Sequence, residues 1–324
     1  MLIDSLNLQS LESFGEKLNR PECVLTAANG SVCVSDWRGG VCILSPDGGQ
    51  QLIVARDTDA AIKPNGIALM NDGSFLLAHL GDDSGGLYQL QRDGECKPIL
   101  VELDGSPLPP SNYPHIDSLG RIWLTVSTCR QPRADAYRAN VSDGFIILID
   151  QSGARIVAEG LGYTNECCVH PDGKYFYVNE TFARRLSRFE IGDTGDLGNR
   201  ETVAEFGAGT FPDGLTFDVD GGIWITSIVS NRIIRISPSG EQQVLLEDVD
   251  PGHLERVEQA YLSHSMGRPH LDQVVSQRLQ NISSLAFGGP DMKTIYLGCL
   301  LGEEIMTCRS PIAGWQPSHW LHPL

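Results

Sequence analysis

The sequence predicts an all-β protein, a six-bladed β-propeller with a short helical insertion between the fifth and sixth blades. Three observations predict this fold. One sequence pattern occurs six times along the 324 residues. Each occurrence has two short apolar runs separated by a turn rich in Asn, Asp and Gly, which is typical of a β-hairpin. The first five occurrences begin 43 to 53 residues apart, and β-rich units with a period of about 40–50 residues are typical of propellers.

The repeat is defined by a polar residue that stands eight positions before the turn, which we call the anchor. The first five anchors and their turn residues are Glu22 and Gly30, Asn65 and Gly73, Asn112 and Gly120, Asn165 and Gly173, and Asp213 and Gly221. The sixth repeat, residues 282–300, is degenerate. Its anchor, Ser283, stands eight residues before Asp291, and the letters "GGPD" form its turn.

Further strands follow the hairpin in most repeats, as in "GFIILIDQSGARIVAEG" and "NRIIRISPSGEQQVLLE", so each repeat predicts about four strands. Six such units close into a ring and leave no long free sheet edge. We therefore expect one propeller domain over residues 1–324. Residues 248–281 interrupt the period, and apolar residues spaced three or four apart, such as Val257 and Ala260, predict a helical, lid-like insertion there.

Charge and hydropathy indicate which classes of partner to expect. The net charge is -17, from 41 acidic and 24 basic residues, and no cluster of Lys and Arg is present to neutralise a run of phosphates, so we expect no nucleic-acid partner. No apolar stretch of about 18 residues and no secretory signal pattern occur, so we expect no membrane association and a cytoplasmic location. A small molecule is the expected partner, and the sequence does not indicate an oligomeric state.

The anchors are the candidate functional residues. In a propeller the innermost strand of each blade lines the central channel, so equivalent positions form a ring around its axis. The ring contains Glu22, Asn65, Asn112, Asn165, Asp213 and Ser283. Two carboxylates, three amides and a hydroxyl are oxygen ligands that suit a hard cation. The alternative, that these side chains cap strand ends and bind water, stays open on spacing alone.

Five segments resemble the SMP-30/gluconolactonase/luciferin-regenerating-enzyme-like family of six-bladed propellers. They are "RPECV", "SNYPHIDSLGRIW", "YTNECCVHPDGKYFYVNET", "FPDGLTFDVDGGIWIT" and "LAFGGPDMKTIYLGCL". The resemblance implies one divalent cation held by Glu22, Asn112, Asn165 and Asp213, with Ca²⁺ favoured and Mg²⁺, Mn²⁺ or Zn²⁺ as alternatives. It also implies metal-dependent hydrolysis of lactones, with phosphotriester hydrolysis in relatives. Asp213 is then the candidate catalytic residue, as general base, water orienter or nucleophile.

The sequence departs from the family pattern near the expected substrate. Pro110 stands where sugar-lactonase members carry an Arg, Tyr113 follows Asn112 in place of Asp, and Glu166 follows Asn165 in place of Gly. These departures favour a lactone or related cyclic ester that is less polar than a sugar lactone.

Six residues are candidates for contact with that substrate, because they belong to the ring, adjoin it or lie in the insertion. They are Asn65, His79, Tyr113, Glu180, Trp37 and His270. Two other classes of function remain open at this stage: a non-catalytic propeller that binds a ligand or a protein, and a metal-dependent isomerase or cyclase.

Overall fold

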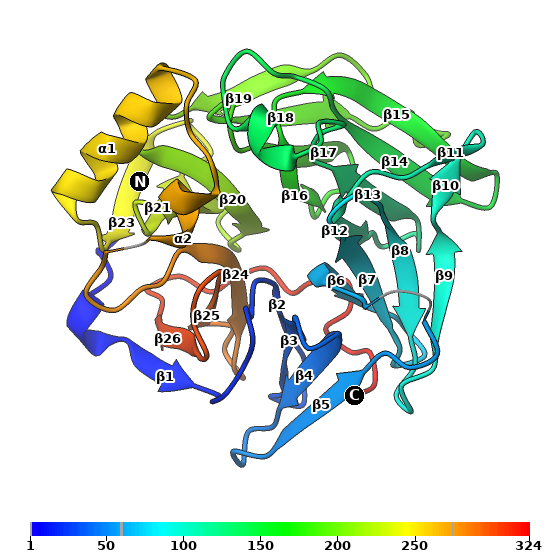
Figure 1. The fold of residues 1–324 in the computed structure, drawn as a ribbon. Coiled ribbons are helices and arrows are strands. Elements are labelled where there is room, and N and C mark those ends of the chain that lie inside the picture. The colour runs from blue at the N-terminus through cyan, green and yellow to red at the C-terminus, as the bar shows by residue number, and fades with distance from the viewer. Residues whose placement is uncertain (1, 59–60, 274) are drawn as a thin grey trace.

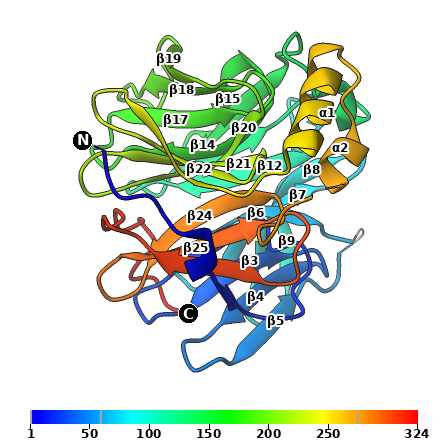
Figure 2. The same ribbon diagram turned by 90° about the vertical axis from the view of Figure 1, so that its left-hand side faces the viewer.

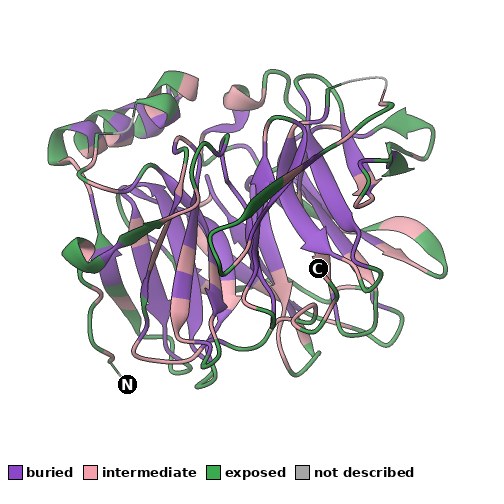
Figure 3. Ribbon diagram, turned by 90° about the horizontal axis from the view of Figure 1, so that it is seen from below, coloured by how far each residue is buried: buried purple, intermediate pink, exposed green. Residues whose placement is uncertain are grey.

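The computed structural model describes residues 2–58, 61–273 and 275–324. Its strands form six four-stranded antiparallel sheets arranged as blades around a central channel (Figure 1). Figure 3 shows the buried strands of the blades between exposed loops. The predicted six-bladed all-β fold is confirmed.

The first three blades follow one another in the chain, each running from its innermost to its outermost strand. Blade one contains β2 (Val24–Thr26), β3 (Val32–Asp36), β4 (Gly40–Leu44) and β5 (Gln50–Val54). Blade two contains β6 (Pro64–Leu69), β7 (Phe75–Leu80), β8 (Gly85–Leu90) and β9 (Cys96–Leu100), and a ribbon of β10 (Glu102–Leu103) and β11 (Ser106–Pro107) follows it. Blade three contains β12 (Ser111–Ile116), β13 (Ile122–Val126), β14 (Gly144–Asp150) and β15 (Gly153–Leu161).

The last three blades complete the ring. Blade four contains β16 (Thr164–Val169), β17 (Tyr175–Glu180), β18 (Arg185–Glu190) and β19 (Glu201–Glu205). Blade five contains β20 (Thr210–Phe217), β21 (Ile223–Val229), β22 (Arg232–Ile236) and β23 (Gln242–Glu247). Blade six contains β24 (Ile282–Gly288), β25 (Thr294–Cys299), β26 (Ile305–Arg309) and, outermost, β1 (Glu12–Phe14). Because β1 pairs with β26, strands from both ends of the chain close the ring.

The anchors lie at irregularities of the inner strands. The pairing of the inner strand with its neighbour skips the anchor in blades two to six, at Asn65, Asn112, Asn165, Asp213 and Ser283. A β-bulge leaves such a residue outside the ladder and re-aims its side chain. In blade one, Glu22 precedes the first residue of β2. The sequence repeat therefore encodes a repeated break in pairing at one end of each inner strand.

Short helical segments lie outside the blades. The helices α1 (Pro251–Leu262) and α2 (Arg268–Asp272) occupy the predicted insertion between blades five and six and stand on one face of the ring (Figures 2 and 3). The 3-10 turn η1 (Leu8–Ser10) precedes β1, and η2 (Arg133–Ala136) lies in the loop between β13 and β14. Neither α1 nor α2, nor any other helix of the described residues, has the length and apolar content needed to cross a lipid bilayer.

A buried carboxylate fixes the hairpin of blade five. Asp218 is 1% exposed and accepts hydrogen bonds from Trp224 Nε1 at 2.7 Å, Arg235 Nε at 2.7 Å and Gly222 N at 2.7 Å. Blade three repeats the arrangement with Asp117 and Trp123, whose Nε1 donates at 3.0 Å. The Asp that precedes the turn thus ties the hairpin backbone to the indole of the second strand.

We predict that Asp218→Ala lowers the free energy of unfolding by about 3 kcal/mol, because Arg235, 4% exposed, would lose its buried counter-charge. Denaturant unfolding measures the change. Asp220→Ala, in the same turn but exposed, is the control and should change stability by less than about 0.5 kcal/mol. Equal losses in the two variants would contradict this role for Asp218.

Candidate functional site

Five of the six anchors meet at one end of the channel. Glu22, Asn65, Asn112, Asn165 and Asp213 line a single small cavity of about 30 Å³, and each is 7% exposed or less. Their side chains come from five different blades. Ser283 does not line the cavity, because its Oγ donates to the backbone carbonyl of Glu22 at 2.8 Å.

The three amides of the cavity are oriented by their amino groups. Asn65 Nδ2 donates to the carbonyl of Asn112 at 3.3 Å, Asn112 Nδ2 to Ser127 Oγ at 3.0 Å, and Asn165 Nδ2 to Thr181 Oγ1 at 3.0 Å. With each nitrogen bonded into the wall, the amide oxygens are free for a ligand. Oδ1 of Asn65 and Oδ1 of Asn112 are fully buried, yet they accept no hydrogen bond from the described residues.

Such unpartnered oxygens are costly. A buried acceptor without a partner costs about 1–3 kcal/mol, and native proteins leave few of them without a functional reason. These two oxygens lie in the same cavity as the carboxylates of Glu22 and Asp213, so hydrogen-bond acceptors outnumber donors among the anchors. The arrangement suits an electropositive ligand that approaches all these oxygens together.

The two carboxylates differ in their surroundings. Glu22 Oε2 accepts a hydrogen bond from Arg20 Nε at 3.0 Å and pairs with Arg20 Nη2 at 2.8 Å, which leaves Oε1 available. The guanidinium of Arg20 lies 4.3 Å from the ring centroid of Trp37. Asp213 has no such pair. Burial, followed by the negative charges of Glu22 and Glu166, raises the pKa of Asp213 well above its usual range, and Arg20 only partly opposes this.

The residues present fit a hard divalent cation. Among the described residues no three His, Cys, Asp or Glu side chains group into a metal site, so amide oxygens have to supply the remaining ligands. Carboxylates with amide carbonyls are the donors that Ca²⁺ and similar cations prefer. A positive charge at the ring would also remove the electrostatic cause of the raised pKa of Asp213.

Aromatic side chains cover the cavity. Tyr137 stacks on Phe182 with ring centroids 4.5 Å apart, and Tyr163 meets Phe182 edge-on at 4.8 Å. Leu271 of α2 also lines the cavity and joins the same apolar cluster. A volume of about 30 Å³ holds only one or two water molecules.

Three arginines that are not among the residues predicted from the sequence line the same cavity. They are Arg20, Arg133 and Arg268. Arg20 lies only two residues before the anchor Glu22, and this closeness in sequence is the one feature that could have predicted its place at the site. Arg133 belongs to η2 and Arg268 to α2, and both segments lie outside the repeat, so no internal comparison along the chain points to them.

Four of the six predicted substrate residues lie near the ring but outside the cavity. Trp37 packs beneath Arg20. His79 Nδ1 accepts a hydrogen bond from Lys63 N at 3.0 Å, and His270 Nδ1 bonds the backbone of Gly267. Glu180, fully buried, accepts from Arg185, Ser187 and the backbone of Gly162, so its carboxylate is already used. Asn65 alone of the six lines the cavity.

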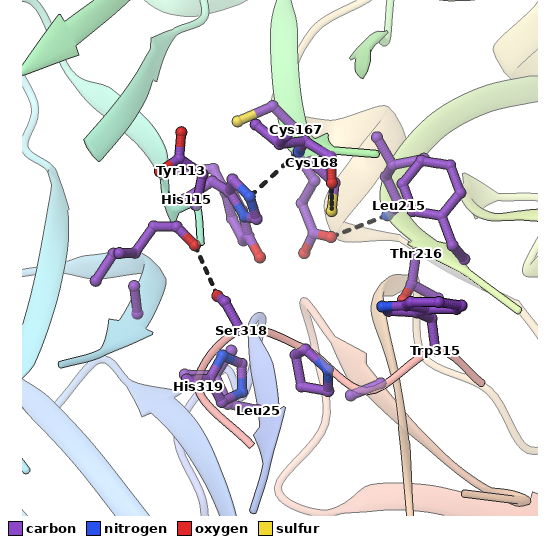
Figure 4. A pocket seen from close by; sticks show the side chains of 18 of the residues that line it. Leu25, Tyr113, His115, Cys167, Cys168, Leu215, Thr216, Trp315, Ser318 and His319 are labelled. Atoms are coloured by element: carbon purple, nitrogen blue, oxygen red, sulfur yellow. Dashed lines mark hydrogen bonds between the residues drawn. The ribbon is translucent and has the colours of Figure 1, made fainter. Parts of the chain in front are cut away.

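The sixth residue, Tyr113, follows the anchor Asn112 and lies on the other side of the ring from this cavity. It lines a larger cavity, about 200 Å³, formed by the far ends of the inner strands and closed by the chain near Trp315 and Ser318 (Figure 4). Ser318 Oγ donates to the carbonyl of Ile116 at 2.7 Å, which holds this segment in place. The ring oxygens do not reach this cavity, so the two spaces are distinct parts of the channel.

Glu166 lies between the two ends. It follows the anchor Asn165, and its Oε2 accepts a hydrogen bond from Leu215 N at 2.9 Å in the larger cavity. Burial raises the pKa of Glu166 to about 8, with a further contribution from the charge of Glu22, although the hydrogen bonds from Leu215 and Ser284 act against the rise. Glu166 stands where the family that the sequence resembles commonly has Gly.

The architecture and the ring define a six-bladed propeller with an oxygen-lined site at one channel mouth. The family model described as "SMP-30/Gluconolactonase/LRE-like region" matches residues 20–247. The chain therefore belongs to the SMP-30/gluconolactonase/LRE-like family. The matched region includes all five anchors that line the cavity.

Curated relatives are similar over part of their length. The chain is 27% identical over 233 residues to a 6-deoxy-6-sulfogluconolactonase of Pseudomonas putida, covering 71% of this chain and 66% of that protein. It is 24% identical over 225 residues to Lactonase drp35 of Staphylococcus saprophyticus, covering 65% of this chain and 64% of that protein. The chain thus spans slightly less than two thirds of these relatives.

Solved structures share the fold. A gluconolactonase of Xanthomonas campestris superimposes with a TM-score of 0.68 at 16% identity, covering 93% of this chain and 89% of that one. The calcium-binding protein regucalcin of Agrobacterium tumefaciens gives 0.65 at 18% identity, covering 96% and 94%. At these identities the likeness establishes the fold alone.

We predict that Glu166 makes the metal-free protein less stable as pH rises. Its carboxyl has a pKa of about 8 in the folded protein against 4.5 ordinarily, so the folded state binds more protons and stability falls between about pH 4.5 and pH 8. Glu166→Gln should remove roughly 2–4 kcal/mol of this fall.

Unfolding free energies at pH 5 and pH 8, with chelator present, measure the effect. The exposed Glu159→Gln is the matched control and should leave the pH dependence unchanged. Glu166→Gln also removes one of the charges that raise the pKa of Asp213, and this acts in the same direction, toward a smaller fall in stability with pH. An unaltered pH dependence in Glu166→Gln would rule out a protonated Glu166.

Proposed function

We propose that this protein is a metal-dependent hydrolase that opens a lactone or related cyclic ester. The observation that carries the proposal is the pair of buried, unpartnered amide oxygens of Asn65 and Asn112 beside the carboxylates of Glu22 and Asp213. A scaffold that only binds a partner has no need to bury uncompensated acceptors at a channel mouth.

Glu22, Asn112, Asn165 and Asp213 would hold the cation, with Ca²⁺ as the first candidate and Mg²⁺, Mn²⁺ or Zn²⁺ as alternatives. Support comes from the four side chains lining one cavity and from the presence of the calcium-binding regucalcin among the proteins with this fold. Asn65, whose Oδ1 is also free, would contact the substrate or a water molecule.

A bound divalent cation would supply Lewis-acid polarisation of the ester carbonyl. The residues of the chain supply the rest. Asp213, once ionised, accepts a proton from the water that attacks the carbonyl carbon. Asn112 and Asn165, fixed through Ser127 and Thr181, keep their oxygens aimed at the ring. The aromatic cover of Tyr137, Tyr163 and Phe182 excludes bulk water from the reacting group.

The assignment to lactones rests on the family. Among the relatives, the Pseudomonas putida and Staphylococcus saprophyticus proteins are named as lactonases. Pro110 occupies the position of the family Arg, and Leu80, Phe182 and Leu300 give the cavity an apolar wall. We therefore propose a substrate whose body carries fewer hydroxyl groups than a sugar lactone.

We predict that protein freed of metal by a chelator hydrolyses lactones only after a divalent cation is added. Release of acid from a panel of aldonolactones and apolar γ- and δ-lactones, with each cation in turn, measures this. Activity that persists in the chelator would contradict metal dependence. Cation binding without lactone opening would move the search to phosphotriesters or to isomerisation, and absence of cation binding would favour a ligand-binding propeller.

We predict that Asp213→Asn lowers kcat by at least about 100-fold, because it removes the proton acceptor and a cation ligand. Asn65→Ala, which alters a neighbouring ring position, should lose no more than about tenfold. Asp220→Asn, in the exposed turn of the same hairpin, is the matched control. Equal losses for Asp213→Asn and Asn65→Ala would contradict the separate roles given to them.

A further inference from the structure

The cavity at the ring carries more positive than negative charge. Three guanidinium groups, those of Arg20, Arg133 and Arg268, line it together with two carboxylates. This is unusual in a chain whose net charge is -17. A divalent cation bound at the ring would add to the positive charge of the lining, which favours a substrate that carries negative charge.

The three arginines differ in how far they are already paired. Arg20 contacts Glu22 and Trp37, so its charge is used within the ring. Arg268 pairs with Asp272 at 2.5 Å, but both side chains are more than a third exposed, and such surface pairs contribute little. Arg133 forms no ion pair and no side-chain hydrogen bond among the residues that the structure describes. Lys63, and to a smaller extent Arg133, lower the pKa of the exposed Asp82 carboxyl.

Arg133 and Arg268 act on the same part of the cavity although they come from different elements. Arg268 and Tyr137 line the cavity together. Arg133 and Tyr163 line it as well. Burial, followed by Tyr137, raises the pKa of Tyr163, and the positive charges of Arg133 and Arg268 oppose that rise. Two guanidinium groups and two phenolic hydroxyls thus form a set of hydrogen-bond donors above the ring.

The ring and the donor set differ in their hydrogen-bonding groups and in their charge. The ring presents oxygen acceptors, whereas the cover presents N–H and O–H donors and positive charge. Apolar side chains, including Phe182, Ile228 and Leu271, line the same cavity. Guanidinium groups bind carboxylate, sulfonate and phosphate oxygens in a fixed, often bidentate geometry.

We propose that the substrate carries an anionic group, a carboxylate, sulfonate or phosphate, that Arg133 and Arg268 bind while its ester lies at the ring. The proposal rests on the proposed function and names the class of substrate. It agrees with the loss of a polar residue at Pro110, because the substrate body contacts the apolar wall and its charge lies at the end. Arg133 and Arg268 are then specificity-determining residues for a reaction that the ring performs.

The test compares matched lactones. A δ-lactone with a side chain ending in carboxylate is set against the methyl ester of the same compound, with sulfonate and phosphate versions as further arms, all in the presence of the activating cation. The wild-type protein should favour at least one anionic lactone by tenfold or more in kcat/KM. The arm with the highest ratio identifies the anion.

Arg133→Gln should reduce that ratio at least fivefold, mainly through a higher KM for the anionic lactone, and Arg133→Lys should restore part of it. Arg130→Gln is the matched control, since Arg130 lies in the same loop, is exposed and does not line the cavity. Its ratio should equal that of the wild type. A wild-type ratio near one, or an equal loss in both Gln variants, would overturn the proposal.

Failure of the proposed function is distinguishable from failure of this inference. If the wild type opens the methyl ester but shows no preference for any anionic version, only the anionic substrate is excluded. If no lactone is opened, calorimetric binding of glutarate as a probe still tests the arginines. Binding that is at least fivefold weaker in Arg133→Gln than in Arg130→Gln supports the anion site, and equal or undetectable binding in both overturns it.

Discussion

The structure depends on one backbone irregularity, repeated around the ring. At each anchor of blades two to six the inner strand leaves its ladder, and in blades three to six a side chain donates a hydrogen bond to the carbonyl of the anchor. Thr125 donates to the carbonyl of Asn165 at 2.9 Å, Asn179 to that of Asp213 at 2.9 Å, and Thr226 to that of Ser283 at 3.0 Å. The same break that directs an anchor into the channel therefore also links neighbouring parts of the propeller.

This constraint explains why the ring lowers the stability of the metal-free protein and why the ring oxygens gather at one end of the channel. Hydrogen bonds to the cavity wall fix the amino groups of the three asparagines, and this fixes the direction of their amide oxygens. The two carboxylates line the same cavity. In the absence of a positive ligand the burial of these groups opposes folding. A cation would pair with the buried acceptors of the ring. An anionic substrate would then balance the positive charge of the cation and of Arg133 and Arg268.

The sequence predicted the blades and the ring because both repeat. Eight-residue spacing from anchor to turn is matched in the structure by left-handed turn glycines, with φ between 75° and 85° at Gly30, Gly73, Gly120, Gly173 and Gly221. Residues without a counterpart in other blades could not be found this way. Arg133 and Arg268 lie in segments that the repeat does not contain. Tyr113, next to an anchor in sequence, lines the far cavity because it lies beyond the break in pairing, where the inner strand rejoins its ladder opposite Thr125.

Anomalous X-ray diffraction from crystals grown with Mn²⁺ locates a bound cation and so tests whether the ring holds a metal. We predict one anomalous peak at about 2.0–2.6 Å from side-chain oxygens of Glu22, Asn112, Asn165 and Asp213. A cation bound elsewhere, with the ring filled only by water, would contradict the central claim that these oxygens converge to hold a metal.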